Sequence, residues 1–439
     1  MYDRNELLIM CPLNILDSFS PKCYARMTVH FSPTLRDIEC TKKKKKKKMI
    51  LSCDYSKSIF FSLRVLISLF KIHGFAPFST TFHGNNNNED VKNKLNVNFS
   101  YSLIGSIYNS IVALIILCEL ICNYIFWPLD DNFTPQHIYN VFQKIGLITI
   151  ILMYSLKQKS LIKIINKLSA VNCDFNSSDR LKLILRYGIY FKIMTVIFYL
   201  TISLIVFISY IVNDFSNLKV NTFIKYFIIF IVGCFITQYS LLLLFIYKKL
   251  CVLNQSFLLL FYNADNISAS SRNISERSNN FFGDDILDKF HSIHKSYQTI
   301  CGILNNVAEF YSLPMLIAIG IIGPNLIVYI NTVIICNGQC DKIKLKVFYN
   351  LLLIFLSFPI VNLTVLATKI NEEIKSTSNI LYKIITVVQS GELSNELELF
   401  SIELLQRDIN FTACGFFKLD NYLITYIIGT GLIYMMIQV

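Results

Sequence analysis

Seven apolar segments, each close to the length of a membrane-spanning helix, constrain this chain more than any other feature of its sequence. A helix needs about 20 apolar residues to cross the hydrocarbon core of a bilayer. Hydrophobic residues make up 54% of the chain and charged residues 16%, whereas a soluble domain carries about a quarter charged residues. We therefore predict an all-α membrane protein with seven transmembrane helices. The segments cover residues 101–126, 139–155, 190–212, 223–247, 310–335, 347–367 and 422–438.

The basic residues of the connecting loops predict an orientation. Loop 156–189 carries seven Lys or Arg residues and loop 248–309 carries six, whereas loop 128–138 carries none and loop 213–222 carries one. Because basic loops stay on the cytoplasmic side, we place the N-terminus in the cytoplasm and the C-terminus outside the cell. This is the reverse of a G-protein-coupled receptor. It also accounts for the net charge of +12 without a nucleic-acid partner.

The N-terminal part of the chain differs from the rest. Residues 1–48 end in seven consecutive lysines, directly before Met49. We expect them to be disordered or an extension of the gene model, with Met49 as the true start. The alternative is a polybasic patch that contacts anionic membrane lipid. Residues 49–98 are predicted to be an N-terminal cytoplasmic segment with an amphipathic helix at 59–78, and residues 99–439 to be the seven-helix domain.

Helical periodicity continues beyond the apolar segments. Residues 286–307 place apolar side chains at three- and four-residue spacing, and residues 370–388 and 392–405 follow a similar pattern. We therefore predict that several helices extend past the bilayer and pack together below it, as a cytoplasmic anchor.

The approach to the last apolar segment joins a charged amphipathic helix to a short run of small and aromatic residues. Asp420 follows this run. It is either a helix N-cap, which is the favoured interpretation, or a carboxylate that gathers cations at the inner mouth of a pore. Small and polar residues within a membrane helix are usually kept because they face protein or water, so the last helix is not a plain anchor. The run consists of Thr412, Ala413, Cys414, Gly415, Phe416 and Phe417.

This junction and the helix pattern together resemble the insect gustatory receptor family, which is related to the insect odorant receptors. The likeness covers about residues 59–438 and is strongest in LFSIELLQRDINFTACGFFKLDNYLI, which begins at Leu399. A weaker sign is the pair Leu253-Asn254 after the fourth segment, as in the family.

The resemblance implies a tastant-gated, non-selective cation channel in the plasma membrane. It implies a homo- or hetero-tetramer with other gustatory receptors, in which residues 99–439 are the receptor channel domain and the seventh helix lines the pore. The end of that helix departs from the family, because Gly431-Leu432 replaces its Thr-Tyr and Val439 replaces its Phe. The alternative to a pore role is that the pore candidates pack as ordinary small residues between helices or lie at the membrane interface. These candidates are Gly429, Gly431, Tyr434 and Gln438.

Polar and aromatic residues in the outer halves of the segments are the candidates for binding a small-molecule tastant. Glu119 is the only carboxylate well inside the first segment, and an intramembrane charge is costly enough to suggest a function. It could hydrogen-bond a sugar or pair with an alkaloid cation; the alternative is a protonated or snorkelling carboxylate near the outer interface. The candidates are Glu119, Tyr139, Gln143, Tyr210, Asn325 and Tyr329.

The remaining reactive residues do not indicate an enzyme. Cys336 and Cys340 bracket a short loop and are the candidate disulfide. His291 and His294 are three residues apart and make a weak metal site, so exposed helix positions are the favoured interpretation. We see no paired acid and base and no nucleophile with its base, and we predict no catalytic residue, no metal and no cofactor.

The alternative functions are a seven-helix receptor without channel activity, or a transporter, although seven segments do not divide into the halves expected of a transporter.

Overall fold

The computed structural model describes most of the predicted helical domain. The described residues are 71, 78–83, 96–126, 135–171, 196, 197, 199, 201, 208, 220–271, 277–339, 343–387, 392–406 and 410–438. The chain divides into two units, Met1–Phe60 and Phe61–Val439, and all described residues belong to the second. The predicted amphipathic helix at 59–78 lies almost entirely outside them, and the predicted boundaries after residues 48 and 98 stay predictions.

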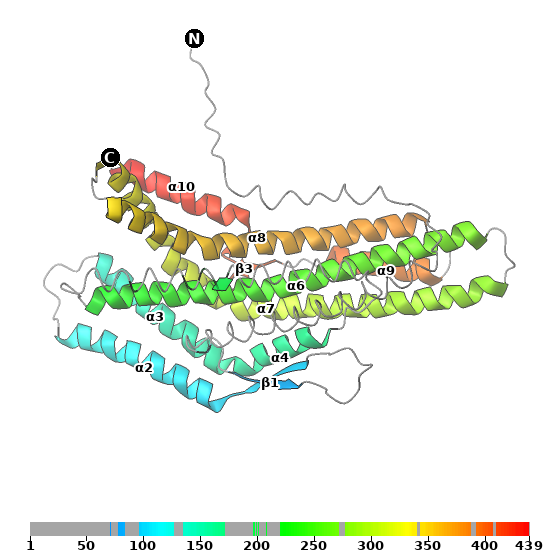
Figure 1. The fold of residues 1–439 in the computed structure, drawn as a ribbon, viewed down its shortest axis with the longest axis horizontal. Helices are drawn as coiled ribbons and strands as arrows, with labels where there is room; N and C mark the ends of the chain where they lie inside the picture. The colour runs from blue at the N-terminus through cyan, green and yellow to red at the C-terminus, as the bar shows by residue number, and fades with distance from the viewer. Residues whose placement is uncertain are drawn as a thin grey trace, which may run out of the picture. The chain divides into compact units, whose positions relative to one another are not determined.

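Three long helices form the centre of this unit (Figure 1). They are α6, Val220–Ser271, α7, Arg277–Gln339, and α8, Ile343–Val387, and α6 packs against both of the others. With 52, 63 and 45 residues, they are about 78, 95 and 68 Å long at 1.5 Å per residue. A hydrocarbon core is about 30 Å thick. Each helix therefore continues far beyond its apolar part, as the periodicity predicts.

Within the part of the chain that the structure describes, five stretches of helix are long and apolar enough to cross a membrane. Two of them belong to α2, Leu103–Phe126, and α3, Pro135–Leu156, and the other three to the long helices. The predicted segment 190–212 lies almost entirely outside the described residues, and α10, Asn421–Gln438, offers only the shorter apolar stretch Asn421–Ile433. A count of seven spans and their orientation therefore remain predictions.

Two short β-hairpins, which the sequence analysis did not predict, interrupt the helical pattern. In the first, β1, Phe78–His83, pairs antiparallel with β2, Asn96–Tyr101. It is fixed to α4, Gln158–Ala170, because the Asn166 side chain accepts the Phe99 N–H at 3.1 Å and donates to the Phe99 carbonyl at 2.9 Å. The second hairpin lies between α9, Glu392–Gln406, and α10, and consists of β3, Thr412–Ala413, and β4, Phe417–Lys418.

A proline inside α8 explains one contact of this core. Pro359 has no N–H, so the carbonyl of Phe355 loses its usual helical partner. The Tyr199 hydroxyl donates to that carbonyl at 3.0 Å, and the Tyr199 ring stacks on Phe355 and Phe358. An unpaired carbonyl in an apolar interior costs several kcal/mol, so the hydrogen bond from Tyr199 stabilises α8 at Pro359.

Asn254 joins α6 to α8 away from the apolar segments. Its amide Nδ2 donates to the carbonyl and to Oε1 of Glu373, each at 2.9 Å, and its Oδ1 accepts from the Thr377 hydroxyl at 2.6 Å. The side chain is buried, and all its polar atoms have partners, which is the condition for such a buried network to stabilise packing. Asn254 of the Leu253-Asn254 pair noted in the sequence thus links α6 to α8 by hydrogen bonds.

Candidate functional site

A buried ion pair joins α2 to α3. Lys144 Nζ lies 2.8 Å from Oε1 and 2.7 Å from Oε2 of Glu119, and the two side chains are only 10% and 18% exposed. Glu119 reaches Lys144 because it follows Asn109, Ala113 and Ile116 on the buried side of α2, at helical spacing. The two charges compensate one another, so Glu119 is neither a lone carboxylate nor a snorkelling one. The sequence analysis did not identify Lys144.

A hydrogen-bonded cluster joins α3 to α7 one to two turns away from the ion pair. The Tyr139 hydroxyl donates to the Ile321 carbonyl at 2.6 Å, and the Asn325 amide donates to both of these oxygens, at 2.9 and 2.7 Å. The helices approach closely here, since a Cβ at Gly146 would lie 2.7 Å from Ile317 Cγ2. Tyr139 and Asn325 are therefore brought into direct contact by the fold.

Of the other ligand candidates, two are buried in helices and one lies outside the described residues. Gln143 lies one turn after Tyr139 on α3, and Tyr329 one turn after Asn325 on α7; both are buried. Tyr210 lies outside the described residues. A separate small cavity opens between α6 and α8, and none of the candidates lines it. Its polar lining residues, Ser240 and Asn362, were missed by sequence reasoning, although each is a polar residue within an apolar segment.

The junction predicted to be distinctive is a tight β-turn. Cys414 and Gly415 are its central residues, and both have positive φ, 51° and 76°. The Phe416 N–H donates to the Ala413 carbonyl at 3.0 Å and closes the turn, and because Ala413 pairs with Phe417 the hairpin loop has three residues. The turn is attached to α7, because the Cys414 N–H donates to the Ser312 hydroxyl at 2.8 Å. Thr412 and Phe417 belong to the two strands, and the Phe416 side chain is exposed.

Asp420 begins α10. Its Oδ1 accepts the Tyr422 N–H at 3.0 Å, and its carbonyl accepts the Leu423 N–H at 3.1 Å. This is the geometry of a helix N-cap, in which a side-chain oxygen accepts from the first turn. The side chain is half-buried.

We expect Asp420→Asn to preserve surface expression and Asp420→Leu to reduce it. Asn keeps an acceptor for the Tyr422 N–H, whereas Leu removes it, which costs about 1 kcal/mol. Surface biotinylation of both variants measures this. Equal surface levels of the two variants would show that the cap does not limit folding.

The candidate pore residues lie on different sides of α10. A Cβ at Gly431 would lie 3.8 Å from Ile327 of α7, whereas a Cβ at Gly429 would have no atom within 4 Å. Gly431 is therefore a packing position within the subunit, and Gly429 faces open space. The side chains of Tyr434 and Gln438 lie outside the described residues, as does Cys340 of the candidate disulfide, while Cys336 lies in the last turn of α7.

Comparisons with known proteins address the whole helical domain. A family model described as 7tm Chemosensory receptor matches residues 63–439. Putative gustatory receptor 28a of Drosophila melanogaster is 27% identical over 152 residues, which are 33% of this chain and 33% of that relative. The aligned part thus spans about a third of the relative's length.

Solved structures are similar to this chain in fold. The insect olfactory receptor OR5 from Machilis hrabei aligns with a TM-score of 0.64 at 14% identity, covering 88% of this chain and 99% of that one. The same receptor in complex with eugenol aligns with a TM-score of 0.56 at 15% identity, covering 88% and 98%. At such identity the likeness concerns the arrangement of helices.

Proposed function

Because the chain belongs to the 7tm chemosensory receptor family, we propose that it is a gustatory receptor: a subunit of a tastant-gated, non-selective cation channel. The proposed subunit lies in the plasma membrane with seven transmembrane helices, its N-terminus in the cytoplasm and its C-terminus outside. Support comes from the gustatory relative, from the fold shared with an insect olfactory receptor, and from the five apolar helices long enough to cross a membrane.

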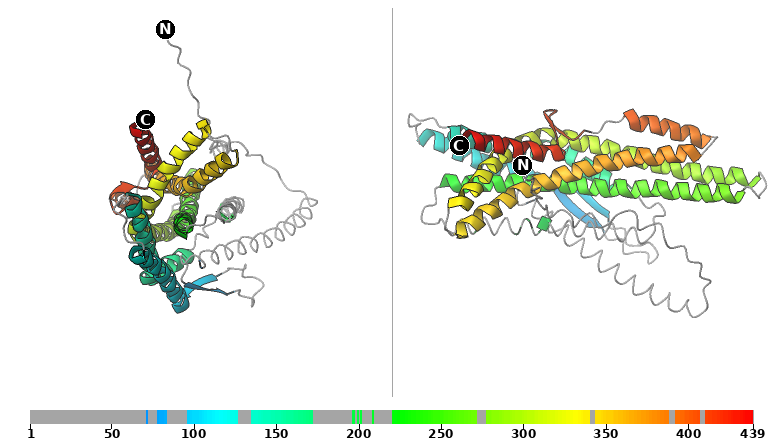
Figure 2. Two further views of the ribbon diagram at one scale, coloured as in Figure 1. Left: turned by 90° about the vertical axis from the view of Figure 1, so that its left-hand side faces the viewer. Right: turned by 90° about the horizontal axis from the view of Figure 1, so that it is seen from above.

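The observation that carries the pore assignment is the one-sided packing of α10. This helix contacts α7 and α8 on one side only and lies on the outside of the bundle (Figure 2). Its other sides expose Thr425, Thr430 and the Gly429 backbone among apolar residues. Polar and small groups at membrane depth favour protein or water over lipid. We infer that these sides of α10 face other subunits and a central conduction path, with Gln438 at its far end.

A second exposed surface supports assembly. Leu399, Ile402 and Leu405 of α9 are 61%, 52% and 79% exposed, and they recur at three-residue spacing along one side of a helix that is otherwise rich in glutamate. A charged helix that carries an uncovered apolar stripe marks a protein-interaction surface. We propose that copies of α9, or of its equivalent in other gustatory receptors, meet here in a tetramer.

The proposed ligand is a small-molecule tastant. OR5 is described in complex with eugenol, which supports binding of a small organic molecule by this fold. Among the described candidates, Tyr139, Gln143, Asn325 and Tyr329 form a polar strip between α3 and α7, while α2 exposes mainly apolar residues and is proposed to contact membrane lipid.

The proposal is tested by recording from cells that express the chain alone or with other gustatory receptors. We expect a tastant from a broad panel to evoke an inward current that is carried by sodium and potassium alike. The current should persist when G-protein cycling is blocked from the recording pipette. A current that disappears under this block would contradict the channel function, as would surface-expressed protein that gives no current with any tastant or partner.

A further inference from the structure

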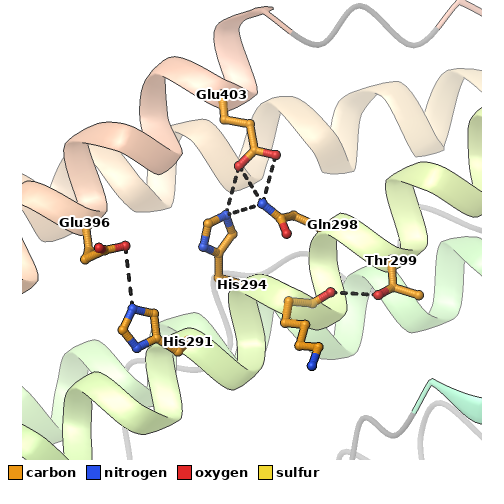
Figure 3. A network of polar contacts seen from close by, with 7 residues as sticks. His291, His294, Gln298, Thr299, Glu396 and Glu403 are labelled. Carbon is orange, nitrogen blue, oxygen red and sulfur yellow. Dashed lines mark hydrogen bonds and ion pairs between the residues drawn. The ribbon is translucent and has the colours of Figure 1, made fainter.

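Two histidine–glutamate pairs connect α7 to α9 (Figure 3). His294 Nε2 lies 2.9 Å from Glu403 Oε2, and His291 Nε2 lies 3.5 Å from Glu396 Oε2. Gln298 Nε2 completes the first pair, since it lies 3.1 and 3.0 Å from the two oxygens of Glu403. The prediction that both histidines occupy exposed helix positions is thus wrong for His294. Its side chain faces α9 and is only 16% exposed.

Helix geometry explains why the pairs form together. His291, His294 and Gln298 recur at spacings of three and four residues, which places them on one face of α7. Glu396 and Glu403 are seven residues apart, which is about two turns on one face of α9. The two helices therefore meet along a seam with matching polar groups on both sides.

The pair between His294 and Glu403 is the better shielded of the two. The imidazole ring of His294 lies 4.2 Å from the Phe400 ring, between centroids, and 5.8 Å from that of Phe290. The side chains of His294 and Glu403 are 16% and 26% exposed, against 48% and 34% for His291 and Glu396. Because solvent screens exposed pairs more strongly, the pair of His294 and Glu403 contributes more to holding the helices together.

This pair lies on the path to the candidate pore helix. α9 leads into the β3–β4 turn and then into α10. The turn is itself attached to α7, through the Cys414 N–H and the Ser312 hydroxyl. The connection from α9 to α10 is therefore held on α7 at two places, and of these two contacts the first is the one that contains histidine and glutamate.

The polar groups in contact with the His294 side chain come from α7 and α9, because Gln298 Nε2 lies 3.1 Å from His294 Nε2 and Glu403 lies across from it, while α9 itself also packs against α8. α9 presents Glu403 and, through His291, Glu396. On α7 itself, Gln298 and His291 lie on the same face, and Asp288 and Lys295, one turn before and after His291, are exposed as His291 and Gln298 are. From α6, Phe257 packs against Phe290 and Phe400 beside the ring. Within the described residues, Glu403 is thus the group that a proton on His294 affects most directly.

We propose that His294, Glu403 and Gln298 are positioning residues that hold α9 on α7 more tightly when the imidazole is protonated, so that gating depends on pH at α9. This inference rests on the proposed channel function. In the orientation predicted from the loop charges, α9 lies in the cytoplasm. Histidine changes its charge between about pH 5 and 8. A protonated ring adds a positive charge beside the Glu403 carboxylate, so the α7–α9 attraction is stronger when the ring is charged than when it is neutral.

The test uses the full-length receptor in excised patches, with the cytoplasmic face at about pH 6 or about pH 8. For wild type we expect the half-maximal tastant concentration to differ about threefold between the two values, the effect of a partly screened ion pair. Glu403→Gln and His294→Gln should remove this difference. His294→Lys, which carries a permanent charge, should give the low-pH behaviour of wild type at both values. His137→Gln changes an exposed histidine at the start of α3 and should keep the difference.

A second measurement separates this inference from the channel function. Purified full-length protein is unfolded by heat at both pH values, and the coupling between His294→Gln and Glu403→Gln is taken from a double-mutant cycle. Coupling that is larger at low pH supports the inference even if no variant gives a current, in which case only the channel function fails. Equal coupling at both values overturns the inference, as does a current in Glu403→Gln that keeps the pH dependence of wild type.

Discussion

Lys144→Met is expected to remove most of the folded protein from the cell surface. The substitution leaves the Glu119 carboxylate in the interface of α2 and α3 without its cation. Breaking a buried ion pair from one side costs about 3–5 kcal/mol, which is comparable to a large part of the stability of a typical domain. We expect the same direction for Glu119→Leu with Lys144 intact. Surface biotinylation and size-exclusion profiles of tagged protein measure the loss.

The double variant Glu119→Leu/Lys144→Met distinguishes the ion pair from simple packing. Replacing both partners of a buried pair with apolar residues is often neutral, so surface levels should recover toward those of wild type. Lys159→Met serves as a matched control, because Lys159 is an exposed lysine of α4, and its surface level should not change. A double variant as poorly expressed as the single variants would contradict the ion pair as the cause of the loss.

Gly415→Val is expected to reduce the tastant-evoked current at least tenfold while leaving surface expression within about twofold of wild type. Gly415 has φ +76°, and a Cβ there would meet no atom within 4 Å, so the substitution acts only on the backbone. A β-branched residue is strongly disfavoured at positive φ, at a cost of about 1–2 kcal/mol or more. The turn should open and release the Cys414 N–H from Ser312, which detaches the segment that leads into α10 from α7.

Two further substitutions make this result interpretable. Asn tolerates positive φ better than other non-glycine residues, so Gly415→Asn should retain most of the current. Gly302→Val places the same side chain at an exposed position in α7 with no atom within 4 Å of the added Cβ, and it should behave like wild type. If Gly415→Val also gave a normal current, the turn would have no part in gating.

The helices were predictable because their signals are local. Each apolar segment apart from 190–212, which lies almost entirely outside the described residues, corresponds to a helix, and the three- and four-residue spacing in 286–307 and 370–388 correctly extends α7 and α8. The turn at Cys414 and Gly415 was not predicted, since its strands are two residues long and show no alternation. An Asn-Gly or Asp-Gly pair would have indicated a hairpin, but Cys-Gly gives a weaker signal.

The candidate site was less predictable because its contacts depend on how helices are turned toward one another. Glu119 and Lys144 are each the single charged residue of their apolar segments, and that shared property could have indicated the ion pair. Nothing local indicates that Asn325 reaches Tyr139, which depends on the close approach of α3 and α7 at Gly146. Similarly, Tyr199 lies 156 residues from the Phe355 carbonyl that it stabilises.

The length of α7 has a mechanical consequence. Pro314 lies inside this helix, and prolines are where helices bend. The part before it, which begins at Arg277, is a rod of about 55 Å that carries His294 along its length. A tilt of about 5° at the proline would displace the far end by about 5 Å, roughly one helical turn. α9 is attached at His294, about 30 Å from the proline, where the same tilt gives a displacement of about 2.6 Å. α7 can therefore act as a lever that transmits a small rearrangement beside Tyr139 and Asn325 to α9.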